Sequence, residues 1–230
     1  MNLSFYTGAV GAQQQQSRMN VHGNNISNVN TYGFKAEKSR FLSVMLATDT
    51  SLKAGGGVNT GYRYDYMING EGYFALLDPA DGQVSYTRNG AFQAAAFRPA
   101  GAAADAEDVM YLSDGEGRLV LDQEGELIPI PQAAGGSQED PEQELPVGIF
   151  DFVNNNGMQH LSGTRFLPVQ KNGGITAGTG ELIRGMLEQS NVDLGEEFAK
   201  VIETQRAYSM ALKMVQTSDE VENTVINLRS

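Results

Sequence analysis

The chain has 230 residues, of which 40% are hydrophobic, so it is long enough to bury one sizeable core or two small ones. Its formal net charge of −12 at pH 7 excludes the basic footprint that non-specific nucleic-acid binding needs. The absence of cysteine excludes disulfide bonds and thiolate zinc sites.

The start of the chain carries no targeting segment of the common type. The stretch MNLSFYTGAVGAQQQQ lacks both the basic n-region and the sustained apolar core of a Sec-type signal peptide. No other stretch approaches the roughly 20 apolar residues of a membrane span. We therefore expect no membrane insertion, and any export must use a route that removes no such signal.

A first helix is predicted from residue 2 to about residue 27, because this segment has no proline and few β-branched residues. Small and apolar residues recur along it at spacings of three and four, namely Phe5, Ala9, Ala12, Gln16, Met19, Gly23 and Ile26. This stripe is weak, so the helix needs a partner to be stable. Residues 24–34 are rich in Asn and Gly, which end helices and favour turns.

The middle of the chain predicts β-structure with many tight turns. Asn or Asp precedes Gly at 69–70, 81–82, 89–90, 114–115, 156–157 and 172–173. These pairs separate runs of β-forming residues at 62–68, 73–77, 84–87, 118–121, 147–153 and 165–169. Tyr62, Tyr64, Tyr66 and Ile68 alternate as in a half-buried strand. We predict an antiparallel β-rich domain, with residues 94–106 and 132–144 as loops.

Much of the negative charge lies within this middle part. Between residues 101 and 146 there are twelve acidic residues and one basic residue, Arg118, whereas residues 1–70 contain three acidic and six basic residues. A local acidic run is typical of a solvated loop face.

The C-terminal segment predicts a longer helix. Asp193 followed by Glu196 resembles an N-cap with a capping-box acid three residues later. Residues then alternate at spacings of three and four through Phe198, Val201, Gln205, Tyr208, Leu212, Val215, Asp219, Glu222 and Ile226. Within the chain, the first helix offers the best match for this stripe, although packing on the chain's own β-domain is an alternative. The order helix, β-rich middle, helix predicts an α+β fold.

No constellation of catalytic residues stands out. The two histidines, His22 and His160, fall in different regions and no GxSxG motif accompanies them; we interpret His22 as a surface or interface residue. Glycines 178, 180 and 185 have the wrong spacing for a dinucleotide-binding loop. The acidic residues at 114–126 do not match the EF-hand pattern. We therefore expect no catalysis, no cofactor and no metal site.

Three stretches resemble the rod and hook protein family of the bacterial flagellum. They are NNISNVNTYGFKAEKSRF at 24–41, INGEGYFALLDPADGQVSYTRNGAF at 68–92, and GELIRGMLEQSNVDLGEEFAKVIETQRAYSMALKMVQTSDEVENTVINL at 180–228. Within the third stretch, the elements SNVDL, QRAY and QTSDE resemble the C-terminal arm of distal rod proteins. The segments GRLVLDQEGELIPIP and VGIFDFVNNNGM also stand in family order.

The resemblance implies a structural subunit of the flagellar basal-body rod. Residues 1–40 would form an N-terminal helical arm and an Asn-rich turn, residues 41–180 a β-rich outer domain, and residues 181–230 a C-terminal arm. The two helices would pair as a coiled-coil-like arm and assemble helically to transmit motor torque to the hook. The implied partners are copies of this chain, other rod and hook proteins, and the flagellar type III export apparatus.

The resemblance also implies roles for particular residues. Those that would carry polymerisation are Phe5, Met19, Ile26, Phe198, Val201, Tyr208, Leu212 and Val215. Those that would form the family's signature turn, where the chain leaves the first arm, are Asn24, Asn25, Asn28, Gly33 and Phe34.

Two departures from the family pattern leave alternatives open. Residues 41–61 are shorter than the insertion typical of distal rod proteins in many Gram-negative species, and the acidic residues of 101–144 match no family segment. A proximal-rod, short hook-like or Gram-positive rod paralogue is therefore an alternative. From another class, we consider a secreted β-domain adhesin or carbohydrate-binding module, which an exposed aromatic platform would favour, and an exported cell-wall hydrolase.

Overall fold

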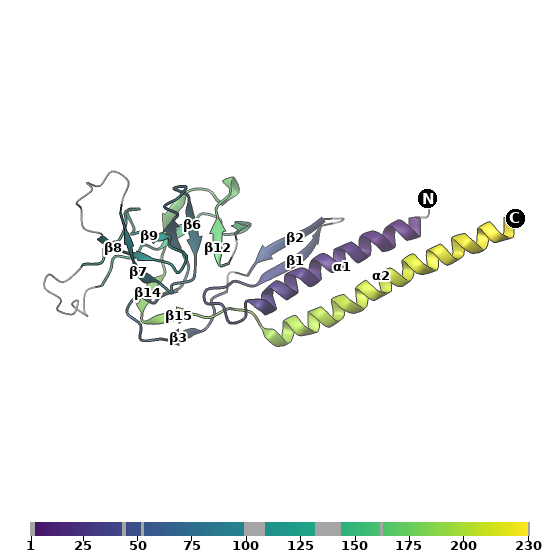
Figure 1. The fold of residues 1–230 in the computed structure, drawn as a ribbon, viewed down its shortest axis with the longest axis horizontal. Coiled ribbons are helices and arrows are strands. Elements are labelled where there is room, and N and C mark those ends of the chain that lie inside the picture. Colours follow the sequence, from purple (N-terminus) through teal and green to yellow (C-terminus); the bar gives the residue numbers. More distant parts are fainter. Residues whose placement is uncertain are drawn as a thin grey trace. The chain divides into compact units, whose positions relative to one another are not determined.

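The computed structural model describes residues 3–42, 45–51, 53–98, 109–131, 144–161 and 163–229. A helix of 25 residues, α1 (Leu3–Ser27), opens the chain, and a helix of 36 residues, α2 (Leu194–Arg229), closes it (Figure 1). Short strands fill the sequence between them, and every strand pairing that the structure describes is antiparallel. The predicted α+β fold is therefore confirmed.

The chain forms two compact units. The helical unit contains the described residues of Met1–Val29, Ala36–Ser51 and Val192–Ser230. The β unit contains those of Asn30–Lys35 and Leu52–Asn191. The sequence stretch from 24 to 35 therefore contributes to both units.

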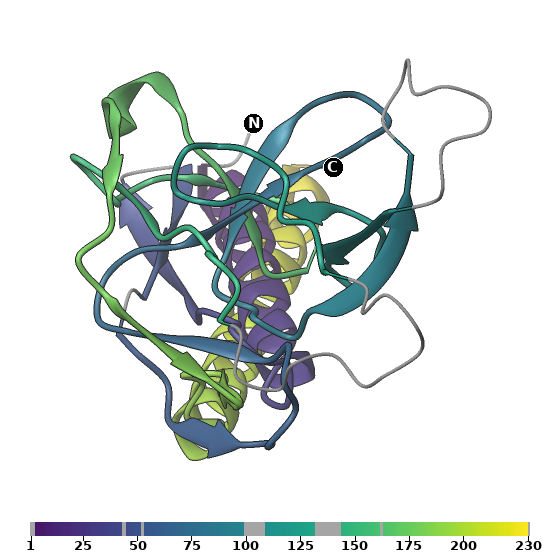
Figure 2. The ribbon, with the colours of Figure 1, turned by 90° about the vertical axis from the view of Figure 1, so that its left-hand side faces the viewer.

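In the helical unit, α1 and α2 lie side by side and run antiparallel (Figures 1 and 2). A hairpin of β1 (Glu37–Leu42) and β2 (Met45–Thr50) also belongs to this unit, with Glu37 opposite Thr50. The sequence does not predict this hairpin, because none of the turn dipeptides falls between residues 37 and 50.

The start of α2 follows from a local signal that the sequence predicts. Asp193 is the N-cap: its carboxylate Oδ1 accepts hydrogen bonds from the backbone N–H groups of Gly195 at 2.9 Å and Glu196 at 3.1 Å. The Glu196 carboxylate lies 2.8 Å from the ammonium group of Lys200, one turn further along the helix.

The β unit is built on one seven-stranded sheet with the order β11-β12-β6-β5-β9-β8-β7. Its strands are β5 (Phe74–Leu77), β6 (Val84–Thr87), β7 (Gln93–Phe97), β8 (Val109–Ser113), β9 (Leu119–Val120), β11 (Gln159–His160) and β12 (Arg165–Leu167).

Smaller strand pairs complete the unit. β3 (Gly57–Asn59) pairs with β15 (Met186–Glu188), β4 (Tyr66–Asn69) with β14 (Glu181–Arg184), and β10 (Phe150–Phe152) with β13 (Ile175–Ala177). A 3-10 turn, η1 (Gln170–Asn172), lies between β12 and β13.

The core of the β unit lies on both faces of β5. Phe74 and Leu76 join one apolar cluster, while Ala75 joins another, because successive side chains of a strand point to opposite faces. The Asp81-Gly82 turn joins β5 to β6, and Gly82 has a φ of +71°, a conformation that glycine adopts without strain.

Each of the six predicted β-runs contains a strand, but two expectations need comment. Residues 94–106 were predicted as a loop, yet Gln93–Phe97 forms β7, because pairing with β8 outweighs the low β-propensity of its alanines. Residues 99–108 and 132–143 lie outside the described ranges. In the predicted strand at 62–68, only residues from Tyr66 onward form β4, and Tyr62 is 49% exposed.

Candidate functional site

The helical unit is the part of the molecule that the sequence connects with assembly, and its two helices approach each other very closely. Gly8 and Ala12 of α1 are buried at this contact. A Cβ atom added at Gly8 would lie 2.9 Å from Cγ2 of Val215 and 3.2 Å from the backbone oxygen of Ala211. Only glycine fits this position, so small residues set the spacing of the two helices.

The row of α2 that faces α1 has a heptad spacing of four and three residues. It consists of Glu197, Val201, Thr204, Tyr208, Ala211, Val215 and Ser218. Three of these residues, Glu197, Thr204 and Ser218, are buried although they are polar. The row shares Val201, Tyr208 and Val215 with the stripe that the sequence predicts. At the other positions, apolar periodicity selected the neighbouring residue, because polar and small residues fill the contact between the helices there.

A buried polar pair links the two helices. Nδ1 of His22 in α1 lies 2.7 Å from Oε2 of Glu197 in α2, and both side chains are less than a tenth exposed. Oε1 of the same carboxylate accepts a hydrogen bond from Lys200 at 3.2 Å. A buried carboxylate that is paired in this way fixes the register of the helices, because any slip would leave it without partners.

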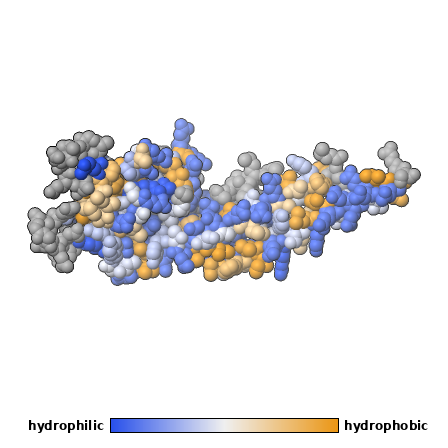
Figure 3. All heavy atoms as spheres, viewed as in Figure 1, coloured by the Kyte–Doolittle hydropathy of each residue, from blue (hydrophilic) through white to orange (hydrophobic). Residues whose placement is uncertain are grey.

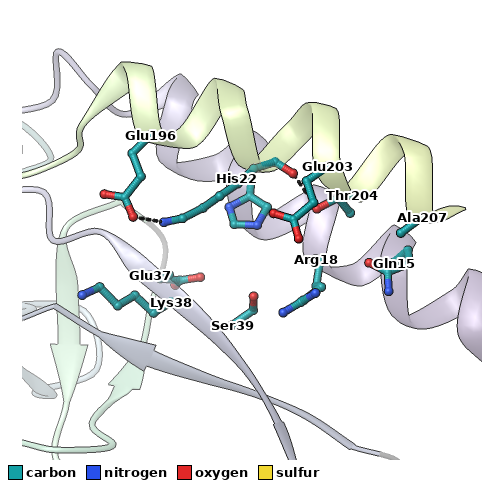
Figure 4. A pocket seen from close by; sticks show the side chains of 11 residues that line it. Gln15, Arg18, His22, Glu37, Lys38, Ser39, Glu196, Glu203, Thr204 and Ala207 are labelled. Atoms are coloured by element: carbon teal, nitrogen blue, oxygen red, sulfur yellow. Dashed lines mark hydrogen bonds and ion pairs between the residues drawn. The ribbon is translucent and has the colours of Figure 1, made fainter.

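A polar cavity of about 330 Å³ opens beside this pair. Figure 4 shows side chains from α1, from β1 and from α2 around it. The acidic residues Glu37, Glu196 and Glu203 are balanced by the basic residues Arg18, Lys38 and Lys200. This balance gives no preference for an anionic or a cationic ligand.

The apolar side chains of the arm lie mostly at its surface. An apolar patch covers the first turns of α2 (Figure 3). The large apolar residues that the two helices expose are Leu3, Phe5, Tyr6, Leu194, Phe198, Ile202, Met210, Leu212, Met214, Val221, Val225, Ile226 and Leu228. Contiguous exposed apolar surface of this kind marks an interaction site.

The residues implied to carry polymerisation fall into two groups. Phe5, Phe198 and Leu212 are 41%, 50% and 40% exposed. The remaining five are partly buried, and they are Met19, Ile26, Val201, Tyr208 and Val215. Of these, Val215 packs directly against Gly8 of α1.

The asparagines of the signature turn hold the end of α1 in the helical unit. Asn25 is fully buried, and its side-chain amide donates to the backbone oxygen of Glu37 at 2.8 Å and accepts from the backbone N–H of Glu37 at 2.9 Å. The side chain of Asn28 donates to the backbone oxygen of Asn24 at 2.9 Å. Asn25 therefore replaces a backbone partner for the first residue of β1.

Gly33 and Phe34, which complete the signature turn, belong to the β unit. Gly33 has a φ of +68°, and a Cβ atom added there would lie 2.3 Å from the backbone nitrogen of Asn89. Its N–H donates to the backbone oxygen of Glu188 at 2.7 Å. Phe34 is buried, with its ring centroid 6.2 Å from that of His160. Both residues are thus dictated by close packing.

The residue after Phe34 belongs to a buried charged cluster that the sequence does not predict. The ammonium group of Lys35 lies 2.6 Å from Oε1 of Glu188 and donates to the backbone oxygen of Lys53 at 2.9 Å. Nη1 of Arg88 lies 3.6 Å from Oε2 of Glu188. All three charged side chains are at most 5% exposed. Burial lowers the pKa of Lys35, although the Glu188 carboxylate acts in the opposite direction.

This cluster ties together several segments that are distant in the sequence. Oε1 of Glu188 also accepts from the backbone N–H of Gly55 at 2.8 Å. The Arg88 guanidinium lies over the ring of Tyr73, 5.6 Å from its centroid, and burial raises the pKa of Tyr73 to about 12. Lys35 lies within the stretch at 24–41 that resembles the family, but no periodicity predicts that Glu188 is buried.

Two negative findings concern the described part of the chain. Its His, Asp and Glu side chains do not gather into a group of three that could hold a metal ion. Neither of its helices is long and apolar enough to cross a membrane.

Comparison with known protein families matches three parts of the chain. The family model described as "Flagella basal body rod protein" matches residues 5–35, which include most of α1 and the signature turn. The model "Flagellar hook protein FlgE/F/G D1 domain" matches residues 67–135 of the β unit. The model "Flagellar basal body rod FlgEFG protein C-terminal" matches residues 183–228, which include most of α2.

Full-length relatives agree with these matches. The chain is 30% identical to the flagellar basal-body rod protein FlgG of Bacillus subtilis (strain 168), with 100% of both chains aligned. It is also 30% identical to FlgG of Buchnera aphidicola subsp. Acyrthosiphon pisum (strain APS), covering 95% of this chain and 96% of the relative. It is 27% identical to the rod protein FlgF of Caulobacter vibrioides, covering 98% and 97%.

The chain therefore belongs to the flagellar basal-body rod protein family, which confirms the resemblance that the sequence carries. It is a structural subunit of the rod and is located in the flagellar basal body.

Proposed function

We propose that this rod subunit polymerises through its own two terminal helices. The observation that carries the proposal is the exposed apolar surface of the helical unit, where Phe198 and Leu212 are half-exposed on α2. Such a surface is unfavourable in water, at about 25 cal/mol for each Å² that stays uncovered, and packing against neighbouring copies removes that penalty. Identical subunits joined by a contact that does not close on itself form a filament, which is the shape of a rod.

In this assembly the predicted residues have different roles. Phe5, Phe198 and Leu212 present apolar surface to neighbouring copies. The partly buried set holds α1 against α2, so that this surface has a fixed shape, and it consists of Met19, Ile26, Val201, Tyr208 and Val215. The signature turn of Asn24, Asn25, Asn28, Gly33 and Phe34 sets the path of the chain out of the first arm.

We further propose the partners and the layout of the assembled subunit. The helical unit forms an inner layer, and the β unit forms the outer domain. Other rod and hook proteins contact the two ends of the stack, through which the subunit passes motor torque to the hook. The chain reaches the rod unfolded through the flagellar type III export apparatus. Membership of a structural family favours a role without catalysis.

A different location of this subunit within the flagellum also has support. The match to a family model that includes the hook protein favours a short hook-like paralogue as one alternative. A proximal-rod paralogue is the other alternative, and the chain does resemble a second kind of rod protein, the relative named FlgF. Deletion of the gene, followed by electron microscopy of isolated basal bodies, distinguishes the positions by the length of rod that remains. In contrast, the aromatic residues of the β unit mainly form its core, which does not favour a carbohydrate-binding module.

The test of polymerisation is Leu212→Asp. A charge at this half-exposed apolar position should abolish motility and rod extension, because the carboxylate would be desolvated in the contact. The circular dichroism signal of the β unit should not change. Asn223→Asp, at an exposed polar position of the same helix, is the matched control and should swim normally. Normal swimming of the Leu212→Asp strain would overturn the proposal.

A further inference from the structure

The exposed apolar residues of α2 form two stripes, one on each side of the row that faces α1. With about 100° of rotation per residue, they lie to opposite sides of Glu197. Stripe A, mainly on the first half of the helix, contains Leu194, Phe198, Ile202 and Leu212. Stripe B, mainly on the second half, contains Met210, Met214, Val221, Val225 and Leu228.

The charged residues of α2 have the complementary pattern. Glu196, Lys200 and Glu203 belong to the first half of α2. They lie on the same side of the helix as stripe B, which begins after them in the sequence. Lys213 and Glu220 belong to the second half of α2. They lie on the same side of the helix as stripe A, most of which precedes them in the sequence. Each side of the helix is therefore apolar over one half of its length and charged over the other.

This alternation excludes neighbours in register. If two copies packed side by side at the same height, the Phe198 and Ile202 side chains of one would face Glu196 and Glu203 of the other. Burying these carboxylates against apolar groups would be strongly unfavourable. Apolar surface meets apolar surface only when the neighbouring helix is displaced along its axis, so that its second half stands beside the first half of α2.

The shapes of the stripes fit the same displacement. A shallow groove of about 420 Å³ runs along stripe B, lined by Ser4, Met214, Thr217, Ser218 and Val221. Stripe A carries the large aromatic side chain of Phe198, which is 50% exposed. The groove is centred about 19 residues beyond Phe198, which corresponds to an axial distance of about 28 Å.

We propose that Phe198 and Ile202 of stripe A in one copy pack against stripe B of a second copy, displaced along the helix axis by about 28 Å, with Phe198 in the groove. This inference rests on the proposed polymerisation and names the surfaces that meet. Because the two stripes differ, the contact is heterologous, and each copy offers a free stripe to the next. In this arrangement the α2 helix of the displaced neighbour does not extend alongside the charged residues on either side of α2.

The test uses engineered cysteines, since the chain has none of its own. Ile202 and Val221 are 19 residues apart and lie on stripes A and B. In isolated basal bodies under mild oxidation, the double variant Ile202→Cys/Val221→Cys should give a ladder of disulfide-linked copies, with at least about tenfold more product than either single variant. Ile202→Cys/Leu212→Cys, with both cysteines on stripe A, is the matched control and should remain monomeric.

A second pair of cysteines tests the same contact in case the first double variant does not assemble. Ser209→Cys/Leu228→Cys has the same separation, and both positions are exposed, so a ladder is expected here as well. Rods that form without either ladder overturn the staggered contact while leaving polymerisation intact. Dimers from Ile202→Cys alone, or links only to a different protein, overturn it too. If wild-type copies do not contact each other in the rod at all, the proposed function itself fails.

Discussion

The two units of this chain treat their large apolar residues in opposite ways. In the β unit, Phe74, Leu112 and Val120 have no measurable exposure. In the helical unit, Phe198, Met210 and Leu228 are at least half-exposed. The β unit completes its core within one chain, whereas the helical unit has surface that only further molecules can cover. Under the proposed function, stability of a single chain and assembly of many chains are encoded in different parts of the sequence.

The two units also differ in how completely the partners of their buried acidic residues are shielded from water. In the β unit, Glu188 is held by Lys35 and Arg88, two cations with at most 5% exposure. In the helical unit, Glu197 is held by His22 and by Lys200, whose side chain is 31% exposed. Water therefore solvates part of the Lys200 side chain, whereas it hardly reaches the two cations around Glu188. The stability of the β unit thus depends more strongly on Glu188 than the stability of the helical unit depends on Glu197.

The largest difference between the two units is expected from Glu188→Ala. It leaves two buried cations without their partner and should lower the free energy of unfolding of the β unit by about 3–5 kcal/mol. Glu197→Ala is the matched change in the helical unit and should cost only about 1 kcal/mol. Urea unfolding followed by tyrosine circular dichroism measures both. Equal losses would contradict the difference between the two clusters.

The next effect concerns leucine in the two units. Leu76→Ala, at 2% exposure in the core of the β unit, should lower the free energy of unfolding by about 2–5 kcal/mol because it leaves a cavity. Leu212→Ala, at 40% exposure, should change it by less than about 1 kcal/mol in the monomer. Urea unfolding at a concentration where the chain is monomeric provides the measurement. A comparable loss from Leu212→Ala would show that the helical unit has a core of its own.

Alkaline pH probes the β unit through Tyr73. Its pKa is raised by burial to about 12 in the folded state, from an ordinary value of 10. The unfolded chain therefore releases this proton first, and stability is lost as the pH rises from 10 to 12, by about 2–3 kcal/mol in total.

The Tyr73→Phe variant isolates this effect. The lowered pKa of Lys35 contributes stability that grows as the pH rises toward 10.5, and this contribution is the same in both proteins. The difference in unfolding free energy between the wild type and Tyr73→Phe should thus shift steadily between pH 10 and pH 12. A difference that stays constant over this range would contradict the role of Tyr73 burial.

The smallest effect compares two glycines of α1. A Cβ at Gly23 meets nothing within 4 Å, so Gly23→Ala should stabilise the helix by up to about 1 kcal/mol. At Gly8 the same change presses on Val215 and on the backbone of Ala211, and should destabilise the helix pair by about 1 kcal/mol. Thermal unfolding followed at 222 nm should shift in opposite directions. Stabilisation by both changes would mean that α1 and α2 do not pack closely in the free chain.

Local signals predicted a good part of this fold. The absence of proline gave α1 its extent, and Asp193 marked the start of α2, because a cap acts within one helical turn. Turn dipeptides such as Asp81-Gly82 separated the strands, since they need only glycine's freedom at positive φ. The hairpin of β1 and β2 and the strand β7 were missed, because partner strands rather than local propensity decide them.

The candidate site was predicted less completely. The stripe inferred from spacing included Phe198 and Leu212, which face outward, and omitted Glu197 and Thr204, which face α1. Periodicity finds apolar residues, but the helices meet through glycine, alanine and paired polar groups. The predicted role of the eight residues in polymerisation, like the division of the chain at residues 40 and 180, stays a prediction.

By itself, the sequence determined the local elements of this protein: two terminal helices, the turns between strands, and the motifs that place it in the rod protein family. These depend on interactions within a few residues, which composition and spacing record directly. Only the tertiary structure decided which side of α2 faces α1 and that Lys35 and Glu188, 153 residues apart, share one buried site. Such contacts depend on how segments distant in the chain pack, and no local pattern specifies that packing.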